Sequence, residues 1–166
     1  MGAVGVLVLA LVVALALMAR RDVDIPKSDF RRVVGEVLRR VGTRGMAVDP
    51  IVTQFALETG YGSGDAFKKT LNLGSIHAIG GPTAYWDGTV TQTGDGPLRT
   101  YKSLDAAAAD YVRMIAEAPH YREAYAWGQA GDAGQFFRAL KAAGYATDPV
   151  YVSSLSAAHK RDGFIV

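Results

Sequence analysis

Residues 49–62 read DPIVTQFALETGYG, and this stretch predicts a short buried helix around which the rest of the chain is organised. Asp49 suits the N-cap and Pro50 the first turn, while Gly60 suits the C-terminal end. Most residues between 51 and 57 are apolar, so Glu58 leaves a hydrophobic core rather than a solvated face. Apolar surroundings disfavour the charged form of a carboxyl group, which prepares it to donate a proton near neutral pH. Glu58 is therefore a candidate general acid, or else a helix-end carboxylate held in a salt bridge.

The composition indicates one domain with an appendage. The chain has 166 residues, of which 49% are hydrophobic, enough to build a sizeable core. It has no cysteine, which excludes disulfides, thiol catalysis and cysteine metal sites. Residues 20–48 hold eight Lys and Arg against four Asp and Glu, a local charge of +4, whereas residues 49–166 hold ten against twelve, a local charge of −2. The mildly acidic larger part argues against a nucleic-acid partner.

The N-terminal segment contains no charged side chain up to Ala19 and consists mostly of Val, Leu and Ala. As a helix it would be about 28 Å long at ~1.5 Å per residue, close to the hydrocarbon thickness of a bilayer. No Lys or Arg precedes the apolar run, and Arg20 and Arg21 follow it at once, as in an uncleaved anchor. We therefore expect residues 1–19 to form a single transmembrane helix in a lipid bilayer. A cleaved signal peptide and a buried apolar helix are the alternatives.

Residues 20–47 are expected to form a basic tether followed by an amphipathic helix. Ser28 suits an N-cap, and apolar residues then recur at helical spacing from Phe30 to Val41, before Gly42 ends the pattern. The arginines of this helix would face water, and contact with acidic lipid head groups is the alternative. The remaining residues, 48–166, are expected to form the main domain.

A change of pattern between residues 79 and 100 predicts a small β-hairpin lobe. Gly-Gly-Pro at 80–82 and Asp-Gly-Pro at 95–97 are turn signals, and residues 84–86 and 89–93 between them are of strand-forming types. Helical patterns follow over 103–117, 121–127, 133–143 and 148–160. Asp148 and Pro149 suit the start of the last helix. The sequence thus predicts a mainly helical domain with a cleft between two lobes.

Six short blocks, in order along the chain, resemble the signature of one enzyme family. They are Ala56–Gly62 (ALETGYG), Asn72–Ala78 (NLGSIHA), Trp86–Val90 (WDGTV), Leu98–Ser103 (LRTYKS), Asp110–Val112 (DYV) and Gly144–Tyr151 (GYATDPVY). Together they are similar to the peptidoglycan N-acetylglucosaminidases of glycoside hydrolase family 73, over roughly residues 48–159. Tyr61 stands for the family's usual tryptophan and His77 for a lysine. Leu73-Gly74-Ser75 departs from the family's Leu-Phe-Gly.

The resemblance implies a mainly α (α+β), lysozyme-like helical domain with a small β-hairpin lobe, preceded here by the N-terminal transmembrane helix. It implies a hydrolase that cleaves β-1,4 glycosidic bonds of peptidoglycan glycan strands, with no metal and no cofactor, and the anchor predicted from residues 1–19 would attach this hydrolase to a membrane. Glu58 would protonate the leaving oxygen. Tyr145 would orient the acetamido group or the catalytic water, unless it is a core residue that fixes a turn.

The candidates for substrate binding are four tyrosine or tryptophan side chains and one amide, namely Tyr61, Asn72, Tyr85, Trp86 and Tyr125. Aromatic side chains offer flat apolar faces on which sugar rings rest. Tyr85 and Trp86 suit that role and the covering of the hairpin's own core equally well. The amide of Asn72 would hold either the catalytic loop or a sugar.

A second carboxylate is expected because glycosidases typically use two. Asp95 aligns with a glutamate that the family often carries on the hairpin lobe, but its side chain is one methylene shorter, and Asp87 is a second candidate. Without either, the substrate's own acetamido group replaces the base, or the enzyme is a lytic transglycosylase. The alternative from another class is a non-catalytic wall-binding or structural module with the same fold.

The location predicted for the protein contains a conflict. Positive charges directly after a membrane span favour keeping the C-terminal side inside the cell, whereas peptidoglycan lies outside the cytoplasmic membrane. Either the C-terminal part is exported in spite of these positive charges, or the membrane is not the cytoplasmic membrane of a cell. One hypothesis is the internal membrane of a virion, where a small anchored hydrolase opens the cell wall during entry and has virion or envelope assembly partners.

Overall fold

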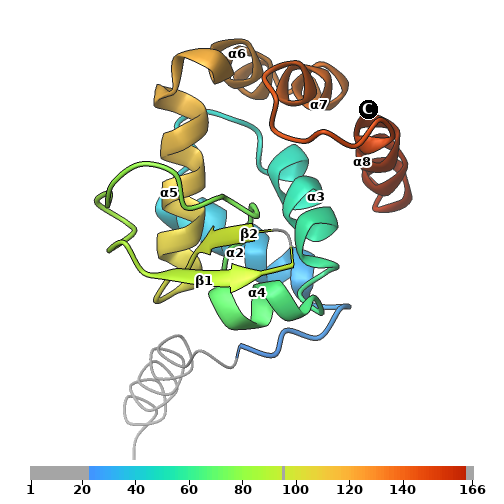
Figure 1. The fold of residues 1–166 in the computed structure, drawn as a ribbon. Helices are drawn as coiled ribbons and strands as arrows, with labels where there is room; N and C mark the ends of the chain where they lie inside the picture. The colour runs from blue at the N-terminus through green and yellow to red at the C-terminus, as the bar shows by residue number, and fades with distance from the viewer. Residues whose placement is uncertain (1–22, 95, 164–166) are drawn as a thin grey trace, which may run out of the picture.

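The computed structural model describes residues 23–94 and 96–163 (Figure 1). Its helices and strands are α2 Phe30–Val41, α3 Val48–Thr59, α4 Asp65–Thr70, β1 Val90–Thr93, β2 Gly96–Arg99, α5 Leu104–Glu117, the 3₁₀ helix η1 Pro119–Tyr121, α6 Arg122–Ala130, α7 Ala133–Ala142 and α8 Tyr151–Arg161. The transmembrane helix predicted over residues 1–19 lies outside the described residues. Within them, no helix combines the length and the hydrophobicity needed to cross a membrane.

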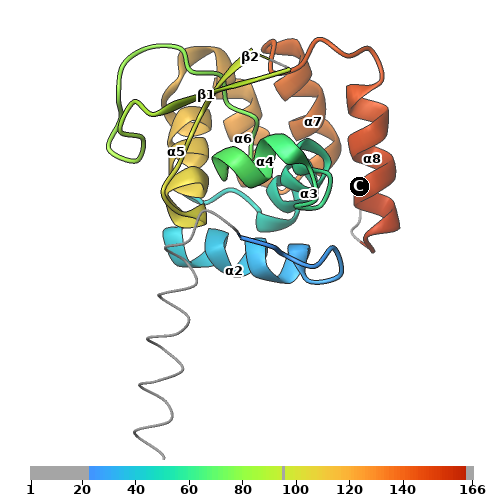
Figure 2. The same cartoon turned by 60° about the horizontal axis from the view of Figure 1, so that its bottom comes forward.

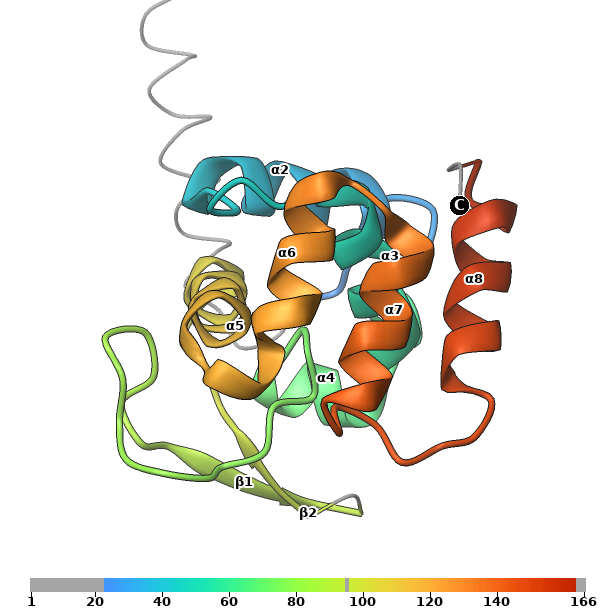
Figure 3. The same cartoon turned by 90° about the horizontal axis from the view of Figure 1, so that it is seen from above.

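Helix α3 lies at the centre of the helical lobe, where α2, α7 and α8 pack against it (Figure 3). Every residue from Pro50 to Ala56 is buried, which explains why polar residues are scarce in this stretch. The helix begins at Val48, slightly earlier than predicted, and ends at Gly60, whose left-handed backbone (φ 57°) suits a glycine C-cap. Leu57 does not extend the apolar surface as predicted, because it is 36% exposed. A rigid, buried helix thus brings its last turn to the surface.

Helix α2 is the predicted amphipathic helix, and it lies across one end of the domain (Figure 2). It packs its apolar face on α3 and α5. It begins at Phe30 rather than at Ser28. The arginines beside it meet acidic groups of the domain: Arg40 lies 2.7 Å from a carboxylate of α5, and Arg44 lies 2.8 Å from Glu117. Two basic side chains of this segment are therefore paired with carboxylates of α5.

The hairpin lobe is confirmed, but its strands differ from the prediction. Strand β1 pairs antiparallel with β2, with Val90 opposite Arg99 and Thr93 opposite Gly96. The prediction that residues 84–86 form a strand is wrong, because Trp86 turns inward as a plug. It is only 3% exposed, its indole N–H donates to the carbonyl of Thr89 at 2.7 Å, and the Arg99 guanidinium lies 4.5 Å from its ring centre. Gly96 and Pro97, predicted as part of a turn signal, are instead the first two residues of β2.

A fully buried carboxylate joins the hairpin lobe to the helices. Asp110 of α5 accepts hydrogen bonds from Arg99 at 2.6 Å, from Tyr101 at 2.8 Å and from Thr83 at 2.9 Å. Burial by itself would raise the pKa of Asp110, but the hydrogen bonds from Tyr101, Arg99, Thr83 and Arg113 outweigh it and lower this pKa below its ordinary value. The position of the hairpin beside the helical lobe therefore depends on one ionised side chain.

The helices after α5 follow the predicted order, and their ends are set by local caps. The side chain of Ser103 caps α5, and the side chain of Asp132 caps α7. Helix α8 begins at Tyr151, later than predicted, because the Asp148 carboxylate accepts the N–H of Val150 at 2.9 Å in a turn before the helix. The segment between α7 and α8 is therefore an ordered loop at the mouth of the cleft.

Candidate active site

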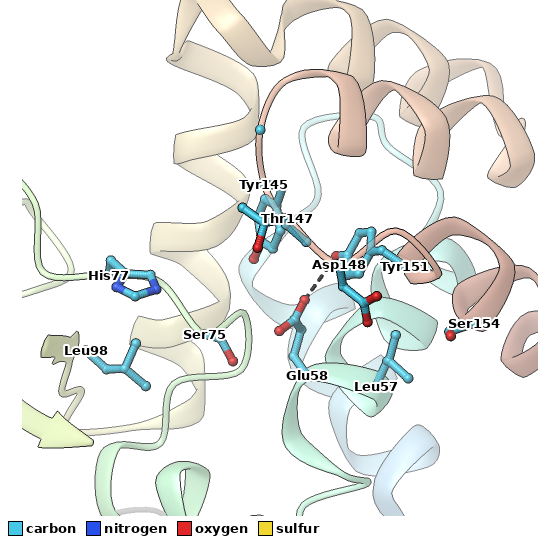
Figure 4. A pocket seen from close by; sticks show the side chains of 12 residues that line it. Leu57, Glu58, Ser75, His77, Leu98, Tyr145, Thr147, Asp148, Tyr151 and Ser154 are labelled. Carbon is cyan, nitrogen blue, oxygen red and sulfur yellow. Dashed lines mark hydrogen bonds between the residues drawn. The ribbon is translucent and has the colours of Figure 1, made fainter. Parts of the chain in front are cut away.

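A pocket of about 580 Å³ opens between the helical lobe and the hairpin (Figure 4). Its walls come from the last turn of α3, the loop after α4, strand β2, the α7–α8 loop and α8 itself. The labelled side chains that line it are Leu57, Glu58, Ser75, His77, Leu98, Tyr145, Thr147, Asp148, Tyr151 and Ser154. Folding thus brings the predicted acid of α3 to the closing sequence block, which lies far from it along the chain.

Glu58 stands at the C-terminal end of α3 with its carboxylate directed into this pocket (Figure 4). The side chain is half-buried, and its Oε1 accepts the hydroxyl of Tyr151 at 3.0 Å. The prediction that Glu58 leaves a hydrophobic core toward a cleft therefore agrees with its place in the structure. A carboxyl group so placed is accessible to a bound substrate and is oriented by the protein.

A chain of buried hydrogen bonds stands behind Glu58. The hydroxyl of Tyr111 on α5 donates to the amide oxygen of Gln54, the Gln54 amide nitrogen donates to the Tyr151 hydroxyl at 3.1 Å, and Tyr151 donates to Glu58. Gln54 lies one helical turn before Glu58, on the same side of α3. The orientation of the acid is thus tied, through this relay, to the packed core of the domain.

Tyr145 lines the pocket beside the relay. Its ring stacks on Tyr151 at 6.4 Å between ring centres and meets Tyr111 edge-on at 6.2 Å, while its hydroxyl donates to the carbonyl of Gly74. Burial, together with the negative charge of Glu58, raises the pKa of Tyr145 and of Tyr151 far above the ordinary value. Both hydroxyls therefore remain protonated and act as hydrogen-bond donors at neutral pH.

Gly74 explains one departure from the family pattern. A Cβ atom at this position would lie 2.8 Å from the hydroxyl oxygen of Tyr145 and 2.8 Å from a ring carbon of Tyr111. A side chain here would therefore displace the two tyrosines. In this chain the Leu73-Gly74-Ser75 segment lets the loop approach the tyrosine cluster closely enough for its carbonyl to accept the Tyr145 hydroxyl.

Asn72 holds the catalytic loop. It is only 2% exposed, and its amide nitrogen donates to the carbonyls of Ile76 at 2.9 Å and Arg99 at 3.0 Å. Its amide oxygen accepts the N–H of Ile76 at 2.9 Å. Of the two roles considered for this amide, the structure assigns it to fixing the loop between α4 and the hairpin, since all these bonds are made within the protein.

Three aromatic residues predicted to bind substrate are engaged elsewhere and are not among the described residues that line the pocket. Tyr61 lies between Lys27 and Arg161, and its hydroxyl donates to Asp162. The hydroxyl of Tyr125 donates to the carbonyl of Arg44 at 2.8 Å, and Trp86 is the plug of the hairpin lobe. Tyr85 is 41% exposed and lines a separate hollow of about 220 Å³. The local sequence identified these four residues as aromatic candidates for sugar binding, but it gave no information on where in the fold each ring would lie.

The other carboxylates predicted for the site are placed differently. Asp95 lies outside the described residues. Asp87 is exposed and pairs with Lys102 at 2.7 Å, and this bond, with those from Thr89, lowers the pKa of Asp87 well below its ordinary value. Asp148, predicted mainly as a helix cap, does not cap α8, whose N-cap is Val150; it accepts the Val150 N–H in the preceding turn and lines the pocket with Glu58. Among residues 23–94 and 96–163, no three His, Asp or Glu side chains gather in a way that would hold a metal ion.

The sequence reasoning missed the supporting residues of the site. The sequence prediction gives no site role to Gln54, a polar exception in the apolar run, and contains Tyr151 only as the last residue of a motif. Two signals were present: a glutamine within an apolar run, one turn before a candidate acid, and a tyrosine repeated six positions after Tyr145. A buried polar side chain needs a partner, and here the partner leads to the acid.

Comparison with known proteins identifies the family of this fold and site. A sequence profile of the glucosaminidase family, described as mannosyl-glycoprotein endo-beta-N-acetylglucosaminidase, matches residues 39–163. The chain is 32% identical, over 129 residues, to the peptidoglycan hydrolase FlgJ of Vibrio parahaemolyticus. That match covers 68% of this chain and 40% of the relative, so the chain spans about two fifths of the relative's length.

Solved structures agree. The glycoside hydrolase domain of Salmonella typhimurium FlgJ superposes with a TM-score of 0.62 at 28% identity, covering 84% of this chain and 89% of that domain. A peptidoglycan hydrolase from Sphingomonas sp. A1 superposes with a TM-score of 0.62 at 25% identity, covering 81% of this chain and 87% of its own. These matches confirm the mainly helical, lysozyme-like fold with its small antiparallel hairpin, and the chain belongs to the glucosaminidase family, glycoside hydrolase family 73.

Proposed function

We propose that this protein hydrolyses β-1,4 glycosidic bonds in the glycan strands of peptidoglycan, with the cleavage preference of an N-acetylglucosaminidase. The observation that carries the proposal is the carboxyl group of Glu58, which points into an open pocket and is oriented by Tyr151 at 3.0 Å. The matched relatives are named peptidoglycan hydrolases, which supports the same substrate.

In the proposed reaction, the protonated carboxyl of Glu58 gives its proton to the glycosidic oxygen as the bond from that oxygen to the sugar C1 breaks. With Asp95 as the base, a water molecule attacks C1 and gives its proton to the Asp95 carboxylate. In the substrate-assisted alternative, the acetamido oxygen attacks C1 as the glycosidic bond breaks, and a water molecule then displaces that oxygen from C1 and returns a proton to the Glu58 carboxylate. Tyr145 lies at the pocket wall, and because its hydroxyl proton is donated to the Gly74 carbonyl, its oxygen would orient the acetamido N–H or the water by accepting a hydrogen bond.

Mass spectrometry of the fragments released from purified peptidoglycan tests this proposal. The full chain is compared with Glu58→Gln, which keeps the shape of the side chain and removes the acid. Products with N-acetylglucosamine at the reducing end, absent with the variant, establish a glucosaminidase. Products with N-acetylmuramic acid at the reducing end would show that the enzyme is a muramidase, which cleaves the other of the two alternating bonds. Products with anhydro-muramic ends would identify a lytic transglycosylase. Unchanged activity of Glu58→Gln would exclude the proposed mechanism, and no products from folded protein would favour a wall-binding module.

We also propose that residues 1–19 anchor the enzyme in a membrane. The support is their uncharged, apolar sequence followed directly by Arg20 and Arg21. The full chain and a version without residues 1–19 are expressed in parallel, and membranes are washed with alkaline carbonate. Only the full chain is expected to stay with the membranes, and its release would refute the anchor.

We propose that this membrane is the internal membrane of a virion. The positive charges after the predicted span disfavour export of the hydrolase across the cytoplasmic membrane, and a small anchored hydrolase suits wall opening during entry. Proteomic detection of the chain in purified virions would support this setting. Detection in uninfected cells alone would exclude it.

A further inference from the structure

A second hollow, of about 360 Å³, continues the active-site pocket past Tyr145. The two share Ser75, His77, Gly144 and Tyr145 as lining residues, so together they form one longer cleft. We call this extension the histidine arm and define it by the side chains of His77, Ile79, Met114, His120 and Tyr121. The mechanism proposed above uses none of these five residues.

The lining of the histidine arm comes from two parts of the chain. The ring of His120 lies 4.1 Å from that of Tyr121, which in turn lies 5.9 Å from Tyr145. The backbone of His77 forms a bridge with Leu98 of the hairpin, and its side chain faces the pocket (Figure 4). The arm therefore presents two imidazoles beside the tyrosine cluster that supports the acid.

The two ends of the cleft differ in chemistry. The pocket end carries two carboxylates, those of Glu58 and Asp148. Among the described residues that line the arm there is no Asp or Glu, whereas His77, His120 and Ser75 all carry hydrogen-bond donors. Arg99 also borders the arm, but it is committed to Asp110 and to a backbone carbonyl. The arm thus suits a group that accepts hydrogen bonds, and a carboxylate is the strongest such acceptor in biological polymers.

Apolar surface lies beside these donors. Ile79 is 77% exposed, and Met114 is half-buried at the same hollow. A branched aliphatic side chain such as Ile79 offers no flat face on which a sugar ring could rest. It matches a short peptide that carries methyl groups and a carboxylate.

We propose that the histidine arm holds the peptide stem of the glycan strand, with His77 and His120 donating to one of its carboxylates and Ile79 packing on its methyl groups. This inference rests on the proposed function, because it takes peptidoglycan as the substrate. Stems are attached to every second sugar of such a strand. A site that accepts a stem beside Tyr145 therefore fixes the register of the strand and decides which of the two alternating bonds lies against Glu58.

The test measures binding in the Glu58→Gln background of the full chain, so that no substrate is consumed. Calorimetry compares a tetrasaccharide that carries peptide stems with chitotetraose, which has neither stems nor carboxylates. Replacing both His77 and His120 with leucine keeps bulky side chains and removes the donors. We expect the affinity for the stem-bearing ligand to fall about tenfold, as the loss of hydrogen bonds to a charged acceptor predicts. The affinity for chitotetraose should fall clearly less than that for the stem-bearing ligand, although His77 also lines the pocket beside Glu58.

Lys68→Leu is the matched control, because it removes an exposed charged donor of α4 that does not line the cleft among the described residues. It should leave both affinities unchanged. If the double variant weakens both ligands equally, or binds the stem-bearing ligand as the parent does, the histidine arm does not recognise stems. If the parent binds neither ligand, the proposed function itself fails together with this inference.

Discussion

Two tyrosine-to-phenylalanine substitutions make the same chemical change at two different carboxylates. Tyr151→Phe removes a hydroxyl that donates to Glu58 at 3.0 Å, and Tyr101→Phe removes one that donates to Asp110 at 2.8 Å. A hydrogen bond to a charged group contributes about 1.5–3 kcal/mol to stability. We expect Tyr101→Phe to cost about 2–3 kcal/mol, because Asp110 is fully buried. Tyr151→Phe should cost about 1–2 kcal/mol, because Glu58 is only half-buried.

The order of the two variants should be the opposite for activity: Tyr151→Phe should lose more activity than Tyr101→Phe. Tyr151→Phe loosens the acid and disconnects it from Gln54, so kcat should fall by about 10- to 100-fold, a part of the 10²- to 10⁴-fold that a general acid supplies. Tyr101→Phe should leave kcat of the folded fraction within about twofold, since Asp110 is not among the described residues that line the pocket.

Urea unfolding and initial rates on solubilised glycan strands, measured on the same preparations, give both quantities. If Tyr101→Phe lowered kcat as much as Tyr151→Phe, the proposed positioning role of the relay would be refuted. A fully active Tyr151→Phe would refute it equally.

Three further substitutions test other parts of the site. Gly74→Ala places a methyl group 2.8 Å from the Tyr145 hydroxyl oxygen, so it should abolish most activity and cost about 1–3 kcal/mol in urea unfolding, and an unaffected enzyme would show that the loop is free to move away. Asn72→Ala removes three buried bonds and should lower stability by about 2–4 kcal/mol, whereas a loss confined to KM would indicate sugar binding instead. The pKa of Asp110 lies below its ordinary 3.8, so its contribution to stability is complete above that pH and is lost as the pH falls through the lower native value. Asp110→Asn should therefore cost about 3–5 kcal/mol at pH 7 and flatten the acid side of the stability curve between pH 2 and 5, and an unchanged slope would contradict this account.

The helical part of the fold was predictable because its signals are local. The apolar run of residues 51–57, the amphipathic repeat of α2 and the caps at Ser103 and Asp132 each specify an element without reference to the rest of the chain. Of the two predicted strand segments, residues 89–93 agree with β1, but residues 84–86 were wrongly predicted for the opposite reason. Whether Trp86 lies in a strand or plugs a loop depends on Arg99, a partner that arrives only on folding.

The site was predictable to a similar degree. Glu58 follows from its position after a buried run, but the other contributors come from distant parts of the chain. Tyr61 and Tyr125 are of a residue type that often binds sugars. However, the ring of Tyr61 contacts Arg161, and the hydroxyl of Tyr125 donates to the carbonyl of Arg44. The family resemblance supplied Tyr145, which no local rule selects. What sequence reasoning lacked was the direction in which each aromatic side chain points.

The contacts around Tyr61 have a mechanical consequence. Lys27 of the N-terminal tether and Arg161 at the end of α8 both lie against this ring, and Asp162 accepts its hydroxyl while also binding Arg31. A displacement of residues 27–31 would therefore be transmitted to the end of α8 as well as along α2. Tyr61 also follows the end of α3, so the same contacts join both ends of the described chain to the turn that follows the catalytic helix.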